Sequence, residues 1–356
     1  MTLYEHPLYM EDIKYTAGLP LPWERLRGRS VVISGATGMI GSFFIDVIMY
    51  LNRETGLDCT VYALGRDKKR FGQRFLWPGQ EGELRFIACD LQDPSAGIEI
   101  KRADLVLHLA SNSHPLQYAT DPIGTILTNT MGLYHMLELA VGCGCERFVF
   151  ASSNEIYGEN RGDTEKFDEG YCGYIDPNTL RAGYPESKRC GEALCQAYRM
   201  QKGLDVVIPR LTRTYGPTML PGDTKAISQF IRRGAEGRDI VLKSAGTQYY
   251  SYQYMADTVS GLITVMFRGQ SGEAYNVADG ASDITLKELA EMIAGLSGSR
   301  VVFEEPDAVE RAGYSAATKA RLDGSKLQML GWKSGYGLRK GLERTIGILK
   351  SVSDRF

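Results

Sequence analysis

The sequence predicts an α/β fold built on a doubly wound parallel sheet, followed by a smaller C-terminal α/β domain. Short runs of β-branched and Leu residues alternate with longer stretches of helical period. Runs that are apolar throughout are typical of strands covered by helices on both faces, as in a parallel sheet. A glycine-rich turn directly follows the first of these runs, where a Rossmann-type sheet turns from strand to helix.

The apolar runs give the strands of this sheet in chain order. They lie at 31–34, 60–64, 84–88, 105–109, 148–151 and 206–208. Stretches of helical period lie at 39–52, about 123–142, about 186–202, near 285–296 and near 338–350. Beyond Pro209 the regular alternation gives way to Gly- and Pro-rich turns.

This pattern divides the chain into three segments. Residues 1–29 lack clear periodicity and are expected to form a partly ordered extension that lies on the main domain. Residues 30–208 form the predicted dinucleotide-binding domain, and residues 209–356 form mainly a substrate-binding domain. Residues 247–277 are a candidate segment for a return to the first domain.

Composition and charge exclude several classes of protein. Hydrophobic residues make up 43% of the 356 residues, too many for a disordered chain. Lys and Arg number 41 against 43 Asp and Glu, and no segment concentrates basic residues as nucleic-acid binding requires. No apolar run approaches the roughly 20 residues that span a bilayer, and early acidic residues argue against a signal peptide. Seven Cys without metal-ligand spacing are typical of reduced thiols in a cytoplasmic protein that binds no metal.

The glycine-rich turn reads Gly35-Ala36-Thr37-Gly38-Met39-Ile40-Gly41, with the spacing Gly-x-x-Gly-x-x-Gly. Glycines allow a tight turn and the close approach of a pyrophosphate, which then lies on the N–H groups of the helix N-terminus. Turns collect glycine in any protein, so the strand before it and the helix after it make the motif informative. The turn therefore predicts a dinucleotide site.

The end of the second predicted strand leaves the type of dinucleotide open. An acidic residue at this position binds the adenosine ribose of NAD, whereas an arginine suits the 2′-phosphate of NADP. Here Arg66 is followed directly by Asp67, and three further basic residues come after them. A solvated charge cluster accounts for the trailing basic residues.

Tyr184 and Lys188 lie four residues apart and share one face of a predicted helix. A lysine ammonium beside a phenol favours the phenolate, and the helix N-terminus acts in the same direction. We therefore expect the pKa of Tyr184 to lie below its usual value, which would make it a general base near neutral pH. In a chain with 20 Tyr this spacing arises by chance, and only its place after the fifth strand gives it weight.

A second polar cluster, Ser153-Asn154-Glu155, follows the strand at 148–151. Sites of α/β sheets form at the carboxyl ends of the strands. Ser153 is expected to hydrogen-bond a hydroxyl group that is being oxidised, and Glu155 offers a second acid/base group. Strand-end Ser and Asn also form ordinary turns, so the cluster by itself leaves both interpretations open.

Together these motifs resemble the extended short-chain dehydrogenase/reductase family, in its branch of nucleotide-sugar epimerases, dehydratases and decarboxylases. The resemblance covers most of residues 30–350. Its motifs are Gly35–Gly41, Cys89-Asp90-Leu91, Asp104–Ser111, Asn129, Ser153–Gly158, Tyr184–Lys188, Arg210 with Tyr215-Gly216-Pro217, and Asp323–Trp332. The stretch between Gly158 and Tyr184 is slightly longer than is usual in the family.

The resemblance implies a tightly held NAD, with NADP as the alternative because of Arg66, and a nucleotide sugar as substrate. Tyr184 would take the proton of the sugar 4-hydroxyl, with Ser153 assisting, Glu155 as a second acid/base group and Lys188 holding the ribose. The residues expected to bind the cofactor are Gly35, Thr37, Gly38, Met39, Ile40, Gly41, Arg66, Asp90, Leu91, Leu109, Ala110, Ser111, Asn129, Tyr184 and Lys188. Those expected to bind the substrate are Ser113, Asn154, Arg213 and Tyr250.

Within this branch the motifs are most similar to those of UDP-glucuronate decarboxylases, with 4-epimerases and 4,6-dehydratases as alternatives. Dehydratases carry an Asp where this chain has Asn154, and simple 4-epimerases usually lack Glu155. The chain departs from the decarboxylases at Arg213, where Asn is usual, and at Tyr250, where a phosphate- or carboxylate-binding Arg is expected. We expect Arg213 to take over that charge pairing. The alternative is that Arg213 pairs with an acidic neighbour such as Asp223, or faces solvent.

The resemblance also implies a homodimer formed through the helices near 123–142 and 186–202. The alternative is that these helices only cover the sheet. A catalytically silent dinucleotide-binding regulator is a further possibility, but Ser153, Tyr184 and Lys188 are all present and argue against it. The expected partners are a small substrate and a second copy of the chain, without nucleic acid or membrane.

Overall fold

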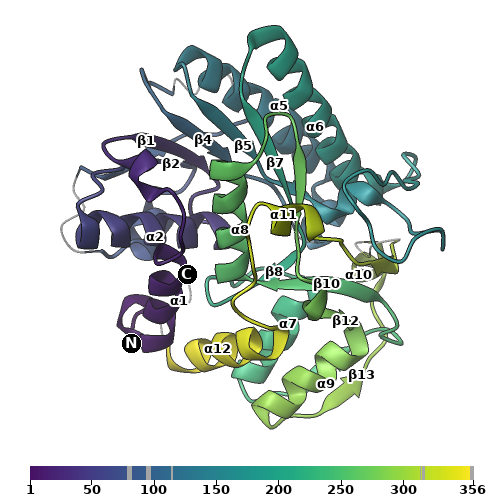
Figure 1. Ribbon diagram of the computed structural model, residues 1–356. Coiled ribbons are helices and arrows are strands. Elements are labelled where there is room, and N and C mark those ends of the chain that lie inside the picture. Colours follow the sequence, from purple (N-terminus) through teal and green to yellow (C-terminus); the bar gives the residue numbers. More distant parts are fainter. Residues whose placement is uncertain (78–81, 94–97, 114, 313, 315–316, 353–356) are drawn as a thin grey trace.

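The computed structural model of the protein describes residues 1–77, 82–93, 98–113, 115–312, 314 and 317–352 (Figure 1). A large sheet with helices on both faces forms one part of the molecule. A smaller sheet with its own helices packs below it in this view. None of the helices among the described residues is long and apolar enough to cross a membrane.

The large sheet is the doubly wound parallel sheet that the sequence predicts. Its order is β3-β2-β1-β4-β5-β7-β11, all neighbouring pairs are parallel, and the two-residue strand β6 pairs with β7. The order reverses between β1 and β4, where α/β sheets bind their ligands. The strands are β1 (Ser30–Ser34), β2 (Thr60–Gly65), β3 (Leu84–Ala88), β4 (Leu105–His108), β5 (Arg147–Phe150), β6 (Ser152–Ser153), β7 (Val206–Leu211) and β11 (Ala274–Val277).

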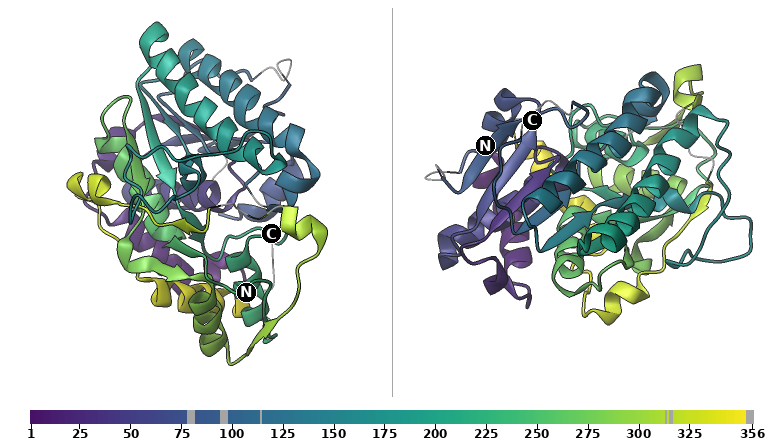
Figure 2. Two further views of the ribbon diagram at one scale, coloured as in Figure 1. Left: turned by 90° about the vertical axis from the view of Figure 1, so that its right-hand side faces the viewer. Right: turned by 90° about the horizontal axis from the view of Figure 1, so that it is seen from above.

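Helices cover both faces of this sheet (Figures 1 and 2). Val31 and Ile33 of β1 pack with α2 and α8 on one face, and Val32 packs with α5 and α6 on the other. All three side chains are fully buried, which explains why the first predicted strand has no polar alternation. The four helices are α2 (Met39–Thr55), α5 (Pro122–Gly142), α6 (Gly183–Lys202) and α8 (Met255–Arg268).

The smaller sheet continues directly from the large one, because β8 follows β7 after a single residue. At its centre, β10 pairs antiparallel with β12 and parallel with β14 and β8; β9 and β13 form a separate pair. The strands are β8 (Arg213–Tyr215), β9 (Ile240–Leu242), β10 (Tyr249–Tyr254), β12 (Asp283–Thr285), β13 (Val301–Phe303) and β14 (Lys319–Ala320). The remaining helices after α1 are α3 (Lys68–Arg74), α4 (Pro115–Thr120), α7 (Ala226–Ala235), α9 (Leu286–Ser297), α10 (Ala308–Ala312), α11 (Ser325–Met329) and α12 (Leu338–Ser351).

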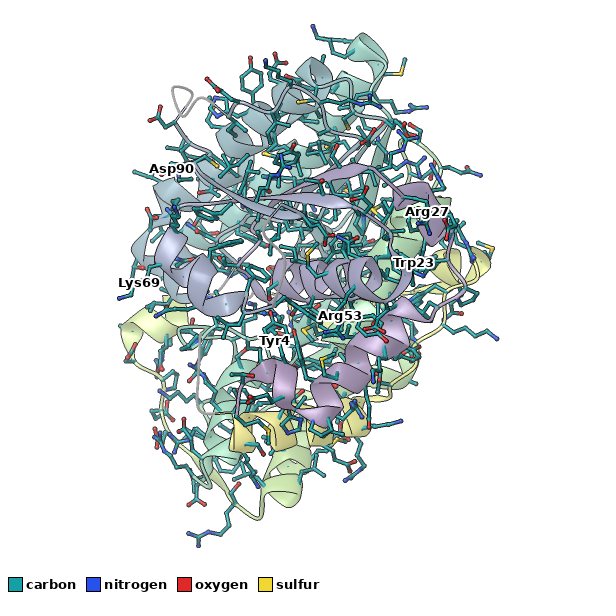
Figure 3. All side chains as sticks on the ribbon, turned by 90° about the vertical axis from the view of Figure 1, so that its left-hand side faces the viewer. Tyr4, Trp23, Arg27, Arg53, Lys69 and Asp90 are labelled. Atoms are coloured by element: carbon teal, nitrogen blue, oxygen red, sulfur yellow. The ribbon has the colours of Figure 1, made fainter. Side chains whose placement is uncertain are left out.

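The N-terminal segment contains helix α1 (Pro7–Ala17), which packs against α2, α8 and α12. Its Tyr9 and Ile13 side chains are fully buried. A buried carboxylate of α2, Asp46, ties this segment down by accepting hydrogen bonds from Tyr4, Tyr9, Arg74 and Trp77. Figure 3 shows Tyr4 at this contact. Two polar residues also lie on the buried face of α1, which is why the sequence shows no clear amphipathic period there.

Two of the element boundaries that differ from the prediction lie near the site. β7 continues beyond 208 to Leu211 and passes through Pro209. Its pairing with β5 ends at Val207, so the missing N–H of Pro209 interrupts no bond to that strand. α6 begins at Gly183 rather than near 186, which places Tyr184 in the first turn of the helix.

Candidate active site

A cavity of about 650 Å³ opens where the order of the large sheet reverses, between the two sheets. Residues of both sheets line it. Of the residues predicted to form the site, those that line the cavity are Gly35, Gly38, Met39, Ile40, Gly41, Leu109, Ala110, Ser111, Ser113, Ser153, Asn154, Glu155, Tyr184, Lys188, Arg213 and Tyr250. The other predicted site residues of the described chain do not line the cavity; they are Thr37, Arg66, Asp90, Leu91 and Asn129.

The glycine-rich turn forms a cradle on one side of this cavity. Gly35 has a φ of 71°, in the left-handed region that favours glycine, and a Cβ there would lie 2.8 Å from the backbone nitrogen of Ala110. A Cβ on Gly41 would lie 2.5 Å from the carbonyl oxygen of Gly35. α2 begins directly after Gly38, and no side chain caps its first N–H groups. The turn therefore fits a dinucleotide phosphate, with no room for a side chain at either glycine.

The residues expected to distinguish NAD from NADP, Arg66 and Asp67, follow the end of β2. Asp67 is the N-cap of α3, and its carboxylate accepts a hydrogen bond of 2.9 Å from the backbone N–H of Arg70. Arg66 is exposed and makes no hydrogen bond or ion pair with the described residues. Asp90 is also exposed, and Figure 3 shows it at the edge of the molecule. The carboxylate of Asp67, next to Arg66 in sequence, therefore already caps the N-terminus of α3.

Tyr184 is buried, and its ring stacks on that of Tyr118 with 4.8 Å between the centroids. Burial raises the pKa of Tyr184 above its usual value of ~10, because a buried phenolate loses its hydration. Hydrogen bonds with Ser153 and Ser111 lower the pKa but do not outweigh burial. The lowered pKa that we expected from the sequence is therefore wrong for the protein by itself.

Lys188 is almost completely buried one turn further along α6. Its ammonium group donates a hydrogen bond of 2.9 Å to the carbonyl oxygen of Ala151, and lies 4.9 Å from the centroid of the Phe150 ring. Burial lowers the pKa of Lys188 to about 8. Among the described residues its ammonium makes no bond to the Tyr184 phenol, which is why the expected stabilisation of a phenolate by Lys188 is not seen.

Replacing Lys188 with Met is expected to stabilise the fold at pH 7 while weakening cofactor binding and lowering the rate. A shift of the pKa from 10.5 to about 8 costs about 3 kcal/mol at this pH, against roughly 1.5–3 kcal/mol for the lost charge-assisted bond to Ala151, so the expected net gain is small. Because the folded pKa is lowered, the cost disappears as the pH rises from about 8 to 10.5. Chemical unfolding at pH 7 and at a more alkaline pH measures both effects. A variant less stable than the parent protein at pH 7 would contradict this account.

Asn129 lies behind the cavity wall and joins two parts of it. Its Oδ1 accepts a hydrogen bond of 2.7 Å from Ser111, and its Nδ2 donates one of 2.9 Å to Ser187. Ser187 in turn donates to the carbonyl oxygen of Tyr184 at 2.8 Å. Asn129 thus connects the loop after β4 with the first turn of α6, through one accepted and one donated hydrogen bond of its side chain.

Glu155 lies between two arginine side chains in the cavity wall. Its Oε2 is 2.7 Å from Nη2 of Arg181, and its Oε1 is 3.8 Å from Nη2 of Arg213. The guanidinium of Arg213 also lies 3.5 Å from the centroid of the Tyr250 ring, whose hydroxyl donates to a backbone carbonyl. Arg213 therefore pairs with an acidic neighbour, as the alternative expected, and that neighbour is Glu155 rather than Asp223. The expected role of Arg213 toward a substrate stays a prediction.

Sequence reasoning missed Arg181 and Tyr118. Arg181 lies in a single 3₁₀ turn directly before α6, and its guanidinium is 4.6 Å from the centroid of the Tyr118 ring. Tyr118 comes from α4, far from both Arg181 and Tyr184 in sequence. The only signal for Arg181 was its place in the stretch before Tyr184 that is longer than usual. No cluster of three or more His, Cys, Asp or Glu side chains in the described part of the chain could hold a metal ion.

Comparison with known proteins gives consistent matches over most of the chain. A model of the NAD dependent epimerase/dehydratase family matches residues 31–278. A UDP-glucuronic acid decarboxylase 1 from Danio rerio is 31% identical over 322 residues, which are 89% of this chain and 72% of that protein. A UDP-glucuronic acid decarboxylase 5 from Arabidopsis thaliana is 31% identical over 317 residues, 88% of this chain and 86% of that protein.

Solved structures share the fold. A UDP-glucose 4-epimerase from Thermotoga maritima matches with a TM-score of 0.77 at 22% identity, covering 90% of this chain and 98% of that one. A dTDP-glucose 4,6-dehydratase from Streptomyces venezuelae, solved with NAD bound, matches with a TM-score of 0.75 at 25% identity, covering 90% and 96%.

Proposed function

The chain belongs to the NAD-dependent epimerase/dehydratase family, and on that basis we propose that it oxidises a nucleotide sugar at carbon 4 and then decarboxylates it. The proposed substrate is a UDP-linked glucuronate, and the proposed cofactor is NAD. The observation that carries the proposal is the convergence of Ser153, Glu155, Tyr184 and Lys188 on one cavity beside the glycine cradle. The names of the relatives at 31% identity support the choice of reaction.

The residues of the cavity divide the proposed chemistry between them. The glycine turn and the start of α2 would hold the phosphates of the dinucleotide, and Lys188 would hold its ribose. A bound nicotinamide would bring a positive charge that favours the phenolate, accept hydride from carbon 4 and later return it. Tyr184 would take the proton of the 4-hydroxyl, while Ser153, already hydrogen-bonded with Tyr184, would orient that hydroxyl.

Decarboxylation follows from where a carboxylate stands relative to carbon 4. Once carbon 4 is a ketone, the 6-carboxylate is β to it, so the C5–C6 bond can break with its electron pair passing to the C4 oxygen. CO₂ leaves, carbon 5 takes a proton from solvent, and Tyr184 returns its proton to O4 when the ketone is reduced. Asn154 stands where dehydratases place the Asp that protonates a leaving hydroxyl, and a neutral amide cannot do this. Epimerisation needs no carboxylate at all.

A panel of nucleotide sugars tests the proposed reaction. The purified protein is incubated with UDP-glucuronate, UDP-glucose and dTDP-glucose, and the products are separated by chromatography, which resolves epimers, and identified by mass spectrometry. We expect only UDP-glucuronate to be converted, to a UDP-pentose. Conversion of UDP-glucose to its epimer, or of dTDP-glucose to a dehydrated keto sugar, would contradict the proposal in favour of the alternatives.

We also expect the protein to form a homodimer through α5 and α6. α5 buries Leu133, Met136 and Leu137 against the sheet, yet a second row of apolar side chains on the same helix stays exposed. The members of this row are Ile123, Leu127, Met131, Tyr134 and Val141, of which Ile123 is 72% exposed. Their spacing of three to seven residues forms a stripe along a helix of 21 residues, about 30 Å long. Pairing this stripe with that of a second copy would bury it.

Light scattering over a range of concentrations measures the state of the unchanged protein and of Met131→Glu, which puts a charge in the middle of the stripe. We expect a dimer for the first and a weaker or absent dimer for the second. A monomer at every concentration of the unchanged protein would contradict the dimer.

A further inference from the structure

We propose that Arg181 and Arg213, held in place by Glu155, form a subsite for the carboxylate of the sugar. The inference rests on the proposed function and deepens it, because it assigns the group that would make the enzyme select a uronate. Arg181 was not predicted from the sequence, whereas Arg213 was expected to bind the substrate. The three side chains meet in the wall of the cavity that also contains Tyr184.

Glu155 fixes the two guanidinium groups relative to each other. Each of its carboxylate oxygens faces a different arginine, at 2.7 Å from Arg181 and 3.8 Å from Arg213. Their side chains are only 14% and 16% exposed, and that of Glu155 is 18% exposed. Stacking of Arg213 on the Tyr250 ring restricts the plane of its guanidinium further. The arginines are thus held in a preset geometry before any ligand arrives.

The pair of arginines has more hydrogen-bond donors than the protein satisfies. Among the described residues, Nε and Nη1 of Arg181 and Nη1 of Arg213 are buried and have no acceptor. A buried donor without a partner is costly, and such groups in native proteins call for an explanation. The cluster also carries two positive charges against one negative charge, a net charge of +1. These three atoms are shielded from the cavity, so an anionic acceptor there would pair with the part of each guanidinium that remains exposed and would balance the excess charge.

The position of the cluster points to the sugar rather than to the diphosphate. The Arg181 guanidinium lies 4.6 Å from the ring of Tyr118, which itself stacks on Tyr184 at 4.8 Å. Arg181 is therefore separated by one aromatic ring from the residue that would act on carbon 4. We therefore place the carboxylate, which is bonded two carbons away from carbon 4, at this cluster, because the phosphates leave from carbon 1 on the other side of the sugar.

The arrangement also suits a carboxylate that must leave. Two arginines without a counter-charge would hold the anion firmly and would be left unpaired once CO₂ departs. Glu155 remains as their partner at both stages. A substrate carboxylate would share the guanidinium groups with Glu155, and loss of CO₂ would return the cluster to the ion pairs that the structure shows.

Binding of UDP and of two UDP-sugars that differ only at carbon 6 tests the subsite. Calorimetric titrations compare UDP, UDP-glucose and UDP-glucuronate on the protein with both arginines unchanged and on Arg213→Gln, each carrying Tyr184→Phe so that UDP-glucuronate is bound without being converted. We expect the protein with both arginines to bind UDP-glucuronate at least about 10-fold more tightly than UDP-glucose, because charge-assisted hydrogen bonds discriminate by this much or more. Arg213→Gln is expected to remove most of this preference while leaving the affinities for UDP and UDP-glucose within about 2-fold, because it removes donors to the carboxylate alone.

Two further variants keep the test decisive. Arg181→Gln should also lose the preference for UDP-glucuronate. If circular dichroism shows Arg213→Gln to be unfolded, Arg181→Gln is used in its place. Lys243→Gln, which removes a cation from the same cavity but from a pair with Glu310, should leave the preference for UDP-glucuronate unchanged. An equal loss of affinity for all three ligands in the arginine variants would place the arginines on the diphosphate and overturn the proposal. No preference in the protein with both arginines, including no measurable binding of any ligand, would also overturn it.

The ligand preference measured by titration can be judged separately from the outcome of the product assay. A preserved preference for UDP-glucuronate without formation of a UDP-pentose would contradict the proposed reaction and leave the carboxylate subsite supported. A UDP-pentose formed by a protein without that preference would support the reaction and contradict the subsite.

Discussion

Replacing Tyr184 with Phe is expected to reduce turnover by about 10³-fold or more, while the fold and the bound dinucleotide stay nearly unchanged. The substitution removes only the hydroxyl that would accept the proton of the sugar, and general acid–base catalysis of this kind contributes roughly 10²–10⁴-fold. The stacking on Tyr118 is kept by the Phe ring. Initial rates, circular dichroism and the dinucleotide released on denaturation measure the three quantities.

Tyr198→Phe provides a matched control for this variant. Tyr198 lies on the same helix, but its hydroxyl donates to Glu138 of α5 and does not line the cavity. We expect this change to lower stability by about 1 kcal/mol and to leave the rate near that of the parent. A Tyr184→Phe protein with a rate near that of the parent would show that another group is the base.

The second large effect is expected at the glycine cradle. Gly41→Ala would place a Cβ 2.5 Å from the carbonyl oxygen of Gly35 and 3.1 Å from Cα of Ala36, so the backbone of the turn must shift. Because the phosphates are expected to lie directly on this turn, we expect the affinity for the dinucleotide to fall by at least about 10-fold and most of the activity with it.

Dinucleotide released from the denatured variant, measured against the parent, checks this expectation. Gly295→Ala is the control, since Gly295 lies in α9 with no neighbouring atom near the position of its Cβ. That change should leave the dinucleotide content unchanged and stabilise the helix slightly. Full dinucleotide content in Gly41→Ala would remove the basis for placing the phosphates at this turn.

The predicted parts of the fold are those that local pattern determines. Strands such as β1, buried on both faces, and long helices such as α5 have a period that is visible in the sequence, and the structure confirms them. The helix of the N-terminal segment was not visible, because its buried face includes polar residues whose partners come from distant parts of the chain. Asp12 of this helix, for example, accepts a hydrogen bond from Arg344.

The residues of the candidate site divide in the same way, into those that local pattern places and those that depend on contacts between distant parts of the chain. Residues that lie at strand ends, such as Ser153 and Ser111, could be placed because the carboxyl ends of parallel strands meet at one edge. Arg181 and Tyr118 could not, because they reach the cavity from an irregular segment and from a short helix without a distinctive pattern. The direction of the pKa shift of Tyr184 was wrong for a related reason, since burial depends on packing that the spacing of Tyr and Lys does not reveal.

The central claim is that the protein removes the carboxylate of a uronate through a 4-keto intermediate. The product formed from UDP-glucuronate in D₂O tests this claim most directly, because the candidate reactions of this family give products that differ in mass or in deuterium content. Decarboxylation through the 4-keto sugar predicts a UDP-pentose that has lost CO₂ and carries one non-exchangeable deuterium at carbon 5. A product of unchanged mass that chromatography separates from UDP-glucuronate and that carries no deuterium would indicate epimerisation, loss of water would indicate dehydration, and either result would contradict the account.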